Sequence, residues 1–378
     1  MPVVARLAIY YFSHFAYVGA FTAYFPLYLA ERGLDAGRIA AVLALPQMAR
    51  IFAPGLWGWV ADRWRAQRGV VVLSCSALAA GLVLLPITQG FAGIAALIAL
   101  MSVLSAGGLP LVEAITLTAL AGRSGRYGPI RLWGSFGFIG AVLTVGAWLD
   151  AGPVRLLPAL LFGLALAALA AALALPGATA HGPTPAGDSD GGRRASGGVR
   201  ALLACGFCMA AAHGALYAFF SLHLEQLGYS GKAIGAFWTL GVLAEIAVFL
   251  YLPAIFRRFT LSAILQASLL AAVLRFLAIA WSAEYVAVLV LAQLLHAATF
   301  GAFHAASVAA VHRLFPRSAQ ARGQALFASL SYGAGSAVGT LLAGWAWEWS
   351  GAPAAFSLSA AAALAGALLA RNLKRAGL

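Results

Sequence analysis

The chain is a succession of apolar runs long enough to cross a lipid bilayer as helices, and this limits what it can fold into. Of its residues, 63% are hydrophobic and 9% are charged. Because backbone polar groups find no water inside a bilayer, such runs must form helices that satisfy their own hydrogen bonds. We therefore expect an all-α membrane protein with twelve transmembrane helices, at about 7–30, 38–61, 69–89, 92–121, 129–150, 154–176, 200–224, 231–256, 260–282, 284–312, 323–347 and 351–371.

The basic residues indicate the topology. A formal net charge of +13 is by itself compatible with nucleic-acid binding. However, seventeen Lys and Arg fall in one set of loops and ends and four in the other, the bias that orients membrane proteins. The larger set is Arg6, Arg63, Arg65, Arg68, Arg123, Arg126, Arg193, Arg194, Arg200, Arg257, Arg258, Arg313, Arg317, Arg322, Arg371, Lys374 and Arg375. The smaller set is Arg32, Arg38, Arg155 and Lys232. We expect a multi-pass membrane protein with both termini in the cytoplasm, and no nucleic-acid partner.

The chain divides into two related halves. The one long polar, Gly/Pro/Ser-rich stretch, 177–199, has the composition of a flexible cytoplasmic linker between bundles 1–176 and 200–378. Residues 25–50 align with 220–245 at an offset of 195 without a gap. The identical pairs are Phe25/Phe220, Leu27/Leu222, Leu29/Leu224, Gly33/Gly228, Ile39/Ile234, Ala41/Ala236, Leu45/Leu240 and Ala49/Ala244. Such a parallel repeat predicts two pseudo-twofold-related six-helix bundles, a transporter architecture.

Five charged residues lie inside the expected helices: Arg50, Glu113, Arg131, Glu245 and Arg275. Isolated in lipid they would together cost roughly 12–18 kcal/mol even on lenient insertion scales, so they must be paired or face water. An internal polar cavity follows. Arg50 is the repeat equivalent of Glu245, which allows the two to pair across a central space or each to pair nearby.

Glu113 and Arg131 lie on consecutive helices joined by a short loop, which puts them within plausible reach of a salt bridge. Ser135 and Phe138 follow Arg131 at helical i+4 and i+7 spacing, so one face offers a guanidinium, a hydroxyl and a ring. This pattern is typical of a substrate site. The alternative is a static ion pair that only fixes helix packing.

The stretch LLHAATFGAFH places His296, Thr299, Phe300 and Phe303 on one helical stripe, with His304 about 80° round the helix. His296 is a candidate for proton coupling, although a lone histidine is often a hydrogen-bonded packing residue. The chain has no HExxH, GxSxG or P-loop motif, so we expect no cofactor, no metal site and no enzymatic activity.

The stretches RYGPIRLWGSFGF, LGYSGKAIGAFWTLGVLAEIAVF and LLHAATFGAFH resemble the major facilitator superfamily, in the branch of the bacterial phenylpropionate permease. The resemblance covers essentially the whole chain. GLWGWVADRW is similar to the cytoplasmic gate motif of that superfamily, with Gly58, Asp62 and Arg63 at matching positions and an irregular basic part after them.

The hairpin also resembles lactose permease, and the resemblance implies a substrate role for Glu113 and Arg131. Arg275 and His296 match part of the coupling group of that permease. Two departures argue against a galactoside and against the same proton site: Phe138 replaces a sugar-stacking Trp, and Thr299 replaces the proton-carrying Glu. Glu245 then becomes the leading acidic candidate.

We therefore expect a monomeric, proton-coupled symporter for a small organic solute, with an aromatic or hydrophobic carboxylate such as phenylpropionate as substrate. Phe300 and Phe303 would join Glu113, Arg131, Ser135 and Phe138 at the substrate, while Glu245, His296, Arg275 and Arg50 would serve coupling. The alternatives are a nucleoside, sugar or drug carrier, including an exporter, and from other classes a membrane enzyme or a non-transporting receptor.

Overall fold

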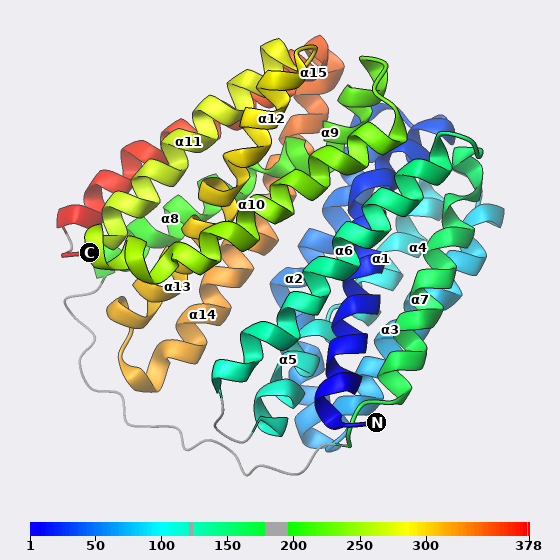
Figure 1. The fold of residues 1–378 in the computed structure, drawn as a ribbon, viewed down its shortest axis with the longest axis horizontal. Helices are drawn as coiled ribbons and strands as arrows, with labels where there is room; N and C mark the ends of the chain where they lie inside the picture. The colour runs from blue at the N-terminus through cyan, green and yellow to red at the C-terminus, as the bar shows by residue number, and fades with distance from the viewer. Residues whose placement is uncertain (121–123, 178–195, 376) are drawn as a thin grey trace. The chain divides into compact units, whose positions relative to one another are not determined.

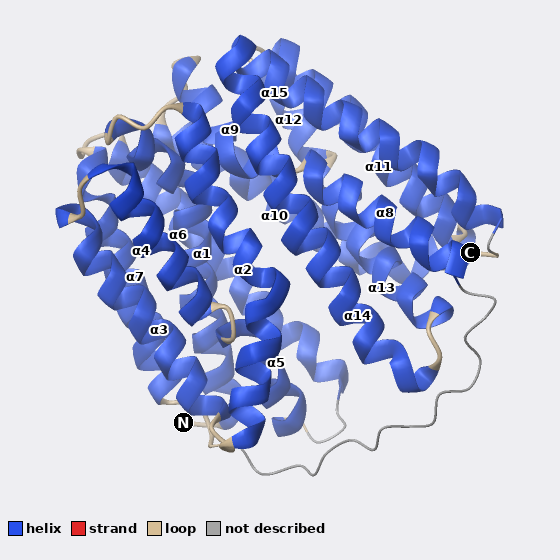
Figure 2. Ribbon diagram, turned by 180° about the vertical axis from the view of Figure 1, so that it is seen from behind, coloured by secondary structure: helices blue, strands red, loops and turns tan. Residues whose placement is uncertain are grey.

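In a computed structural model that describes residues 1–120, 124–177, 196–375 and 377–378, every regular element of the described chain is a helix (Figures 1 and 2). In the first half these are α1 Val3–Glu31, α2 Ala36–Arg63, α3 Gln67–Leu84, η1 Leu85–Ile87, α4 Gly90–Ser105, α5 Gly108–Ala119, η2 Ser124–Arg126, α6 Tyr127–Leu149, η3 Val154–Leu156 and α7 Leu157–Leu173. In the second they are α8 Ser196–Ala212, α9 Gly214–Gln226, α10 Gly231–Arg258, α11 Leu261–Ser282, α12 Val286–Leu294, η4 Ala297–Ala302, α13 Phe303–Leu314, η5 Arg317–Ala319, α14 Gln320–Ala328, η6 Ser329–Gly335 and α15 Ser336–Arg375.

Ten helical stretches of the described chain are long and apolar enough to cross a membrane. The expected all-helical class is therefore confirmed. Helix α1 has 29 residues but is not among the ten, and the last stretch, of 56 residues, contains non-helical Ser350 and Gly351 within α15. Short breaks also divide α4 from α5, α8 from α9 and α12 from α13, each within a single expected span.

The chain packs into two compact units. Unit 1 comprises Met1–Gly182 and Gly228–Thr239, and unit 2 comprises Pro183–Leu227 and Leu240–Leu378, so α10 is shared. The expected linker at 177–199 falls mostly on residues 178–195, outside the described residues, and the domain boundary placed there stays a prediction. The first residues of α10 join unit 1 through Asp150, whose carboxylate accepts hydrogen bonds from the backbone N–H groups of Gly231 and Lys232.

In each unit one helix packs against two others, and with one of these two it makes close backbone contact. In unit 1, α1 packs against α6 and α7, and in unit 2, α15 packs against α8 and α11 (Figure 1). Glycine permits the approach, because a Cβ at Gly137 would lie 2.0 Å from the carbonyl oxygen of Phe12, and one at Gly339 would lie 2.1 Å from that of Ala211. Small residues at helix contacts are the usual means of packing in membranes, where no hydrophobic force drives helices together.

The internal repeat extends to local backbone geometry. Gly33 follows α1 with φ of 78°, and its equivalent Gly228 follows α9 with φ of 84°, a left-handed conformation that favours glycine. Two residues later, Asp35 and its equivalent Ser230 each accept a hydrogen bond from the backbone N–H three residues on, at 2.8 and 3.2 Å, at the start of α2 and α10. The repeat therefore preserves a helix end, a turn and a helix start.

Candidate functional site

The first cluster of polar groups lies in unit 1 and is built around Arg131 of α6. The centre of its guanidinium lies 3.9 Å from the ring centroid of Phe15 and 5.7 Å from that of Tyr11, both on α1. Tyr11 and Phe15 are one helical turn apart, so both rings face the same side of α1. Attraction between a guanidinium and the face of a ring holds the side chain in place without neutralising its charge.

Glu113 of α5 does not form the expected ion pair with Arg131. In the described part of the chain no carboxylate oxygen lies within the 4.0 Å of an Arg131 nitrogen that an ion pair requires, and no group accepts a hydrogen bond from this side chain. Glu113 instead accepts a hydrogen bond from the hydroxyl of Tyr127, at 3.3 Å. Both charged side chains are half-buried, so a carboxylate and a guanidinium remain available on neighbouring helices.

Two other predicted substrate residues follow Arg131 on α6. Ser135 is half-buried one turn on. Phe138 lies two turns on, about 10 Å along the helix, and its ring packs against α1 at Gly19 and lies 6.4 Å from the ring of Trp238. The ring that stacks with Arg131 is therefore Phe15 rather than Phe138. The sequence analysis missed Phe15, Tyr11 and Tyr127, although the run YYFSHFAY shows an aromatic stripe on the first helix.

The second cluster lies in unit 2 and is built around Arg275 of α11, which is only 1% exposed. Its Nη2 donates to Oε1 of Gln293 at 2.8 Å, and its Nη1 donates to Nδ1 of His296 at 3.0 Å and to Oγ1 of Thr299 at 3.1 Å. Three neutral acceptors thus surround a buried cation. Gln293 was missed by the sequence analysis, and its position one turn before His296 is the only signal that pointed to it.

These bonds fix the tautomer of His296. A guanidinium has no lone pair to offer, so Nδ1 must be the acceptor and the ring proton must sit on Nε2. Nε2 lies 3.9 Å from Oε2 of Glu245, whose side chain is 21% exposed. His296 cannot carry a second proton while Nδ1 accepts from Arg275, so in this arrangement it is a neutral donor facing the carboxyl group of Glu245.

The helix carrying His296 departs from the regular α-helix that we expected. Residues Ala297–Ala302 form a π-helical stretch, η4, which holds more residues per turn. As a result, the rings of His296, Phe300 and His304 stack in one column, with centroid distances of 5.3 and 6.3 Å and 11° between successive planes. The expected offset of about 80° between His296 and His304 stays a prediction. Phe303 points into the interior of unit 2 and is 3% exposed.

The remaining predicted residues lie on α2. Arg50 is exposed and donates to Oε1 of Gln47 at 3.0 Å, so its predicted pairing with Glu245 stays a prediction. Gly58 is half-buried, and Asp62 and Arg63 are exposed at the end of the helix. Within the described chain the gate motif makes no ion pair of its own.

Comparison with known proteins identifies the family. The family model described as the MFS_1-like family matches residues 4–358. A probable 3-phenylpropionic acid transporter of Escherichia coli (strain K12) is 30% identical over 358 residues, which are 91% of each chain. A maltose permease of Geobacillus stearothermophilus is 28% identical over 350 residues, 91% of this chain and 88% of the permease.

Solved structures agree on the fold. A crystal structure of the nucleoside transporter NupG superposes with a TM-score of 0.83 at 19% identity, covering 100% of this chain and 99% of NupG. A structure of the peptide transporter POT gives a TM-score of 0.81 at 16% identity, covering 99% and 94% of the two chains. The enzyme and receptor alternatives are thereby set aside, and the expected resemblance is confirmed. The chain belongs to the MFS_1-like family of major facilitator transporters and is a multi-pass membrane protein that carries small molecules.

Proposed function

We propose that this transporter is a proton-coupled symporter that carries a small aromatic or hydrophobic carboxylate, such as phenylpropionate, by alternating access. The observation that carries the proposal is the guanidinium of Arg131, which is half-buried on the rings of Phe15 and Tyr11. No carboxylate oxygen of the described chain lies within 4.0 Å of its nitrogens. A half-buried cation inside the membrane is energetically costly, and an anionic substrate that binds to it would offset that cost.

The chemistry of the site favours a carboxylate with an apolar body. A guanidinium fork binds a carboxylate through two parallel charge-assisted hydrogen bonds. Ser135 supplies a hydroxyl one turn away, and Phe138 supplies apolar surface two turns away on the same helix. Glu113, held by Tyr127, would orient Arg131 or accept a proton from the substrate. The name of the Escherichia coli relative, a phenylpropionic acid transporter, agrees with this substrate class.

The substrate role is tested by Arg131→Lys in purified protein with 3-phenylpropionate. A point ammonium cannot make the paired hydrogen bonds of a guanidinium. Loss of one charge-assisted bond, about 1.5–3 kcal/mol, weakens binding roughly 10- to 100-fold, which calorimetry measures directly. Wild-type affinity in the double variant Glu113→Ala with Arg131→Ala would exclude both residues from substrate binding.

For proton coupling we propose Glu245 as the carrier, with His296 and Arg275 as its immediate environment and Arg50 as its repeat equivalent in the first half of the chain. His296 is held as a neutral ring by Arg275, so the carboxyl group 3.9 Å from its Nε2 is the group in this cluster that is free to change its protonation state. A conformational change that alters the distance of a cation from this carboxyl group would load the proton on one side and release it on the other.

Glu245→Gln tests this role in proteoliposomes, because glutamine mimics a protonated acid that cannot release its proton. We expect substrate counterflow to persist and accumulation under an inward proton gradient to be lost. Glu31→Gln, an exposed acid at the end of α1, is the matched control. Undiminished gradient-driven accumulation by Glu245→Gln would move the search to Glu113 and His296.

We further propose twelve membrane crossings in two bundles of six, a monomer in the bacterial inner membrane, and cytoplasmic termini. The ten spans, the break in α15 and helix α1 together supply twelve crossings. The motif residues Gly58, Asp62 and Arg63 would then lie at the cytoplasmic surface as a gate. Labelling of intact cells should reach Gln89→Cys and miss Ser318→Cys, both exposed in the structure, and the reverse result would invert the topology.

A nucleoside, sugar or drug carrier, importing or exporting, is the second candidate. The observation in its favour is the similarity to a maltose permease, which covers as much of the chain as the similarity to the phenylpropionic acid transporter. A thermal-shift panel of aromatic acids, sugars and nucleosides separates the two candidates.

A further inference from the structure

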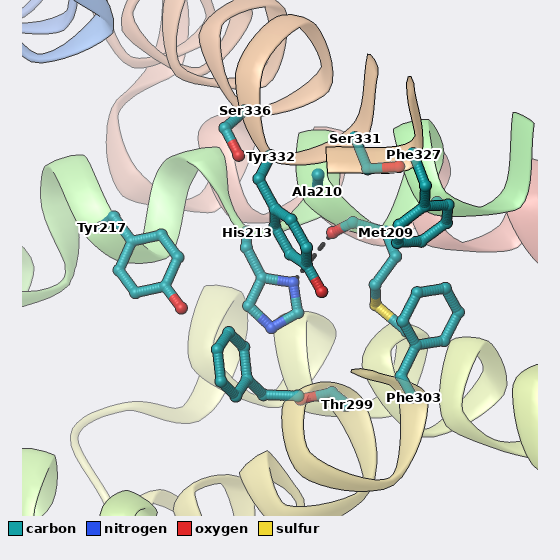
Figure 3. A pocket seen from close by; sticks show the side chains of 12 residues that line it. Met209, Ala210, His213, Tyr217, Thr299, Phe303, Phe327, Ser331, Tyr332 and Ser336 are labelled. Carbon is teal, nitrogen blue, oxygen red and sulfur yellow. Dashed lines mark hydrogen bonds between the residues drawn. The ribbon is translucent and has the colours of Figure 1, made fainter. Parts of the chain in front are cut away.

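Unit 2 contains a small cavity that adjoins the proposed coupling cluster at Thr299. It has a volume of about 30 Å³, enough for one or two water-sized groups. Figure 3 shows His213, at the junction of α8 and α9, among the lining side chains, with Thr299 of η4 on one side and Tyr332 of η6 on the other. Both π-helical stretches of the chain therefore contribute to its wall.

His213 presents a bare nitrogen to this cavity. Its Nδ1 lies 2.8 Å from the carbonyl oxygen of Met209, and because a carbonyl only accepts, Nδ1 carries the proton (Figure 3). In the neutral ring, Nε2 then has an unshared lone pair. His213 is 4% exposed, and Nε2 has no hydrogen-bond partner within the described residues.

A second polar atom of the lining is in the same situation. The hydroxyl of Ser331, on η6, is also buried without a partner among the residues that the structure describes. Buried polar groups are paired in the great majority of cases, and each exception asks for an explanation. Two buried polar atoms without a partner in one cavity indicate that the cavity binds a polar group.

The lining defines what that group is. A lone pair on His213 requires a donor, which a carboxylate does not have. The rings of Phe300, Phe303 and Phe327 make the wall apolar, and Arg275 lies close by with its charge uncompensated by any carboxylate within 4.0 Å, so a cationic donor is disfavoured. The volume admits a hydroxyl and excludes a ring. A neutral hydroxyl group satisfies all three conditions.

We propose that the cavity binds a hydroxyl group of the transported solute, with Nε2 of His213 as its acceptor and Ser331 as its second partner. The inference rests on the proposed function in assuming a small organic solute, and it narrows that class to hydroxylated members. The hydroxyl enters the cavity while the body of the solute stays outside it. His213 is thus a specificity-determining residue beside the Arg275 cluster, with its ring centroid 6.3 Å from that of His296.

The test uses a matched pair of probes, 3-phenylpropionate and its ring-hydroxylated forms, with binding to the full chain measured by calorimetry. We expect the wild type to bind a hydroxylated form about tenfold more tightly. His213→Asn keeps an amide N–H for the Met209 carbonyl, but its shorter side chain places no acceptor where Nε2 lies, so the preference should fall to about one. Ser331→Ala should reduce it partly. Ser307→Ala, which alters a buried unpartnered hydroxyl outside the cavity lining, should leave it unchanged.

The outcomes separate this inference from the proposed function. Equal binding of the two aromatic acids by the wild type overturns the hydroxyl site and leaves the substrate class intact. If neither acid binds, the substrate class fails, and the pair uridine and 5′-deoxyuridine decides the inference: a preference that disappears in His213→Asn supports it, and no preference overturns it. If His213→Asn lowers thermal stability but changes no preference, the cavity holds only water and the proposal is wrong.

Discussion

Two arginines in comparable membrane helices, Arg131 in unit 1 and Arg275 in unit 2, show how the same side chain can serve opposite purposes. Arg275 is 1% exposed and donates to three side-chain acceptors. Arg131 is half-buried, lies over the ring of Phe15 and has no hydrogen-bond acceptor among the described residues. The protein supplies three acceptors to the guanidinium of Arg275, whose Nε stays without a partner among the described residues, and it supplies none to that of Arg131.

The difference follows from what each neighbourhood offers. Gln293, His296 and Thr299 provide neutral acceptors, which satisfy a guanidinium without cancelling its charge. Aromatic rings orient a guanidinium from its face and leave its N–H groups in plane and unoccupied. A count of charges in the sequence treats the two residues alike, whereas their contacts differ, and on this difference rests our proposal of Arg275 for coupling and Arg131 for substrate binding.

The largest expected difference is in stability. Arg275→Met would leave three buried acceptors unpaired, at about 1–3 kcal/mol each, whereas Arg131→Met loses a cation–π contact of about 0.5–2 kcal/mol and gains apolar surface. Thermal denaturation in detergent should show a large fall in Tm for Arg275→Met and a small change for Arg131→Met. Adding Gln293→Leu to Arg275→Met should recover part of the loss, and a larger fall for Arg131→Met would reverse the two roles.

Where the local backbone is the same in both units, equivalent substitutions should lower the thermal stability by the same amount. Gly33→Ala and Gly228→Ala each force a residue with a Cβ into a left-handed conformation, at about 1–2 kcal/mol, and neither Cβ would meet another atom within 4 Å. We expect similar losses of Tm from the two variants. Gly163→Ala, in helix α7 with the same open surroundings, should raise Tm slightly, and unequal losses would show that the repeat is not energetically symmetric.

The smallest effect should come from the ring under Arg131. Phe15→Leu removes the cation–π contact, about 0.5–1 kcal/mol at a partly exposed site, and leaves the guanidinium. Binding of 3-phenylpropionate should weaken about two- to fivefold, since Arg131 loses its orientation but not its charge. Phe136→Leu, an exposed ring on the same helix as Arg131, is the control. Unchanged binding would mean that Phe15 does not position Arg131.

Much of the fold was predictable from the sequence, because the length of an apolar run and the side of its flanking charges act locally. The internal repeat was predictable too, including the equivalence of Gly33 and Gly228. The contacts of Arg131 were not, since a ring on α1 competes with a carboxylate on α5, and that competition depends on helix packing. The same holds for the partners of Arg275, because one of them, Thr299, lies in a π-helical stretch that no pattern in the run AATFGA predicts.

In the π-helical stretch η4, the number of residues determines the local structure more than their hydrophobicity does. A π turn holds about one residue more than an α turn, so deletion of a single residue between Ala297 and Ala302 would restore a regular helix with the same hydropathy. The side chains from Phe303 onward would keep their orientation, because the π turn is what absorbs the extra residue, and only the side chains between Ala297 and Ala302 would change their directions. Single-residue deletions here, rather than substitutions, are the changes by which a descendant of this transporter would acquire a new lining at this place in one genetic step.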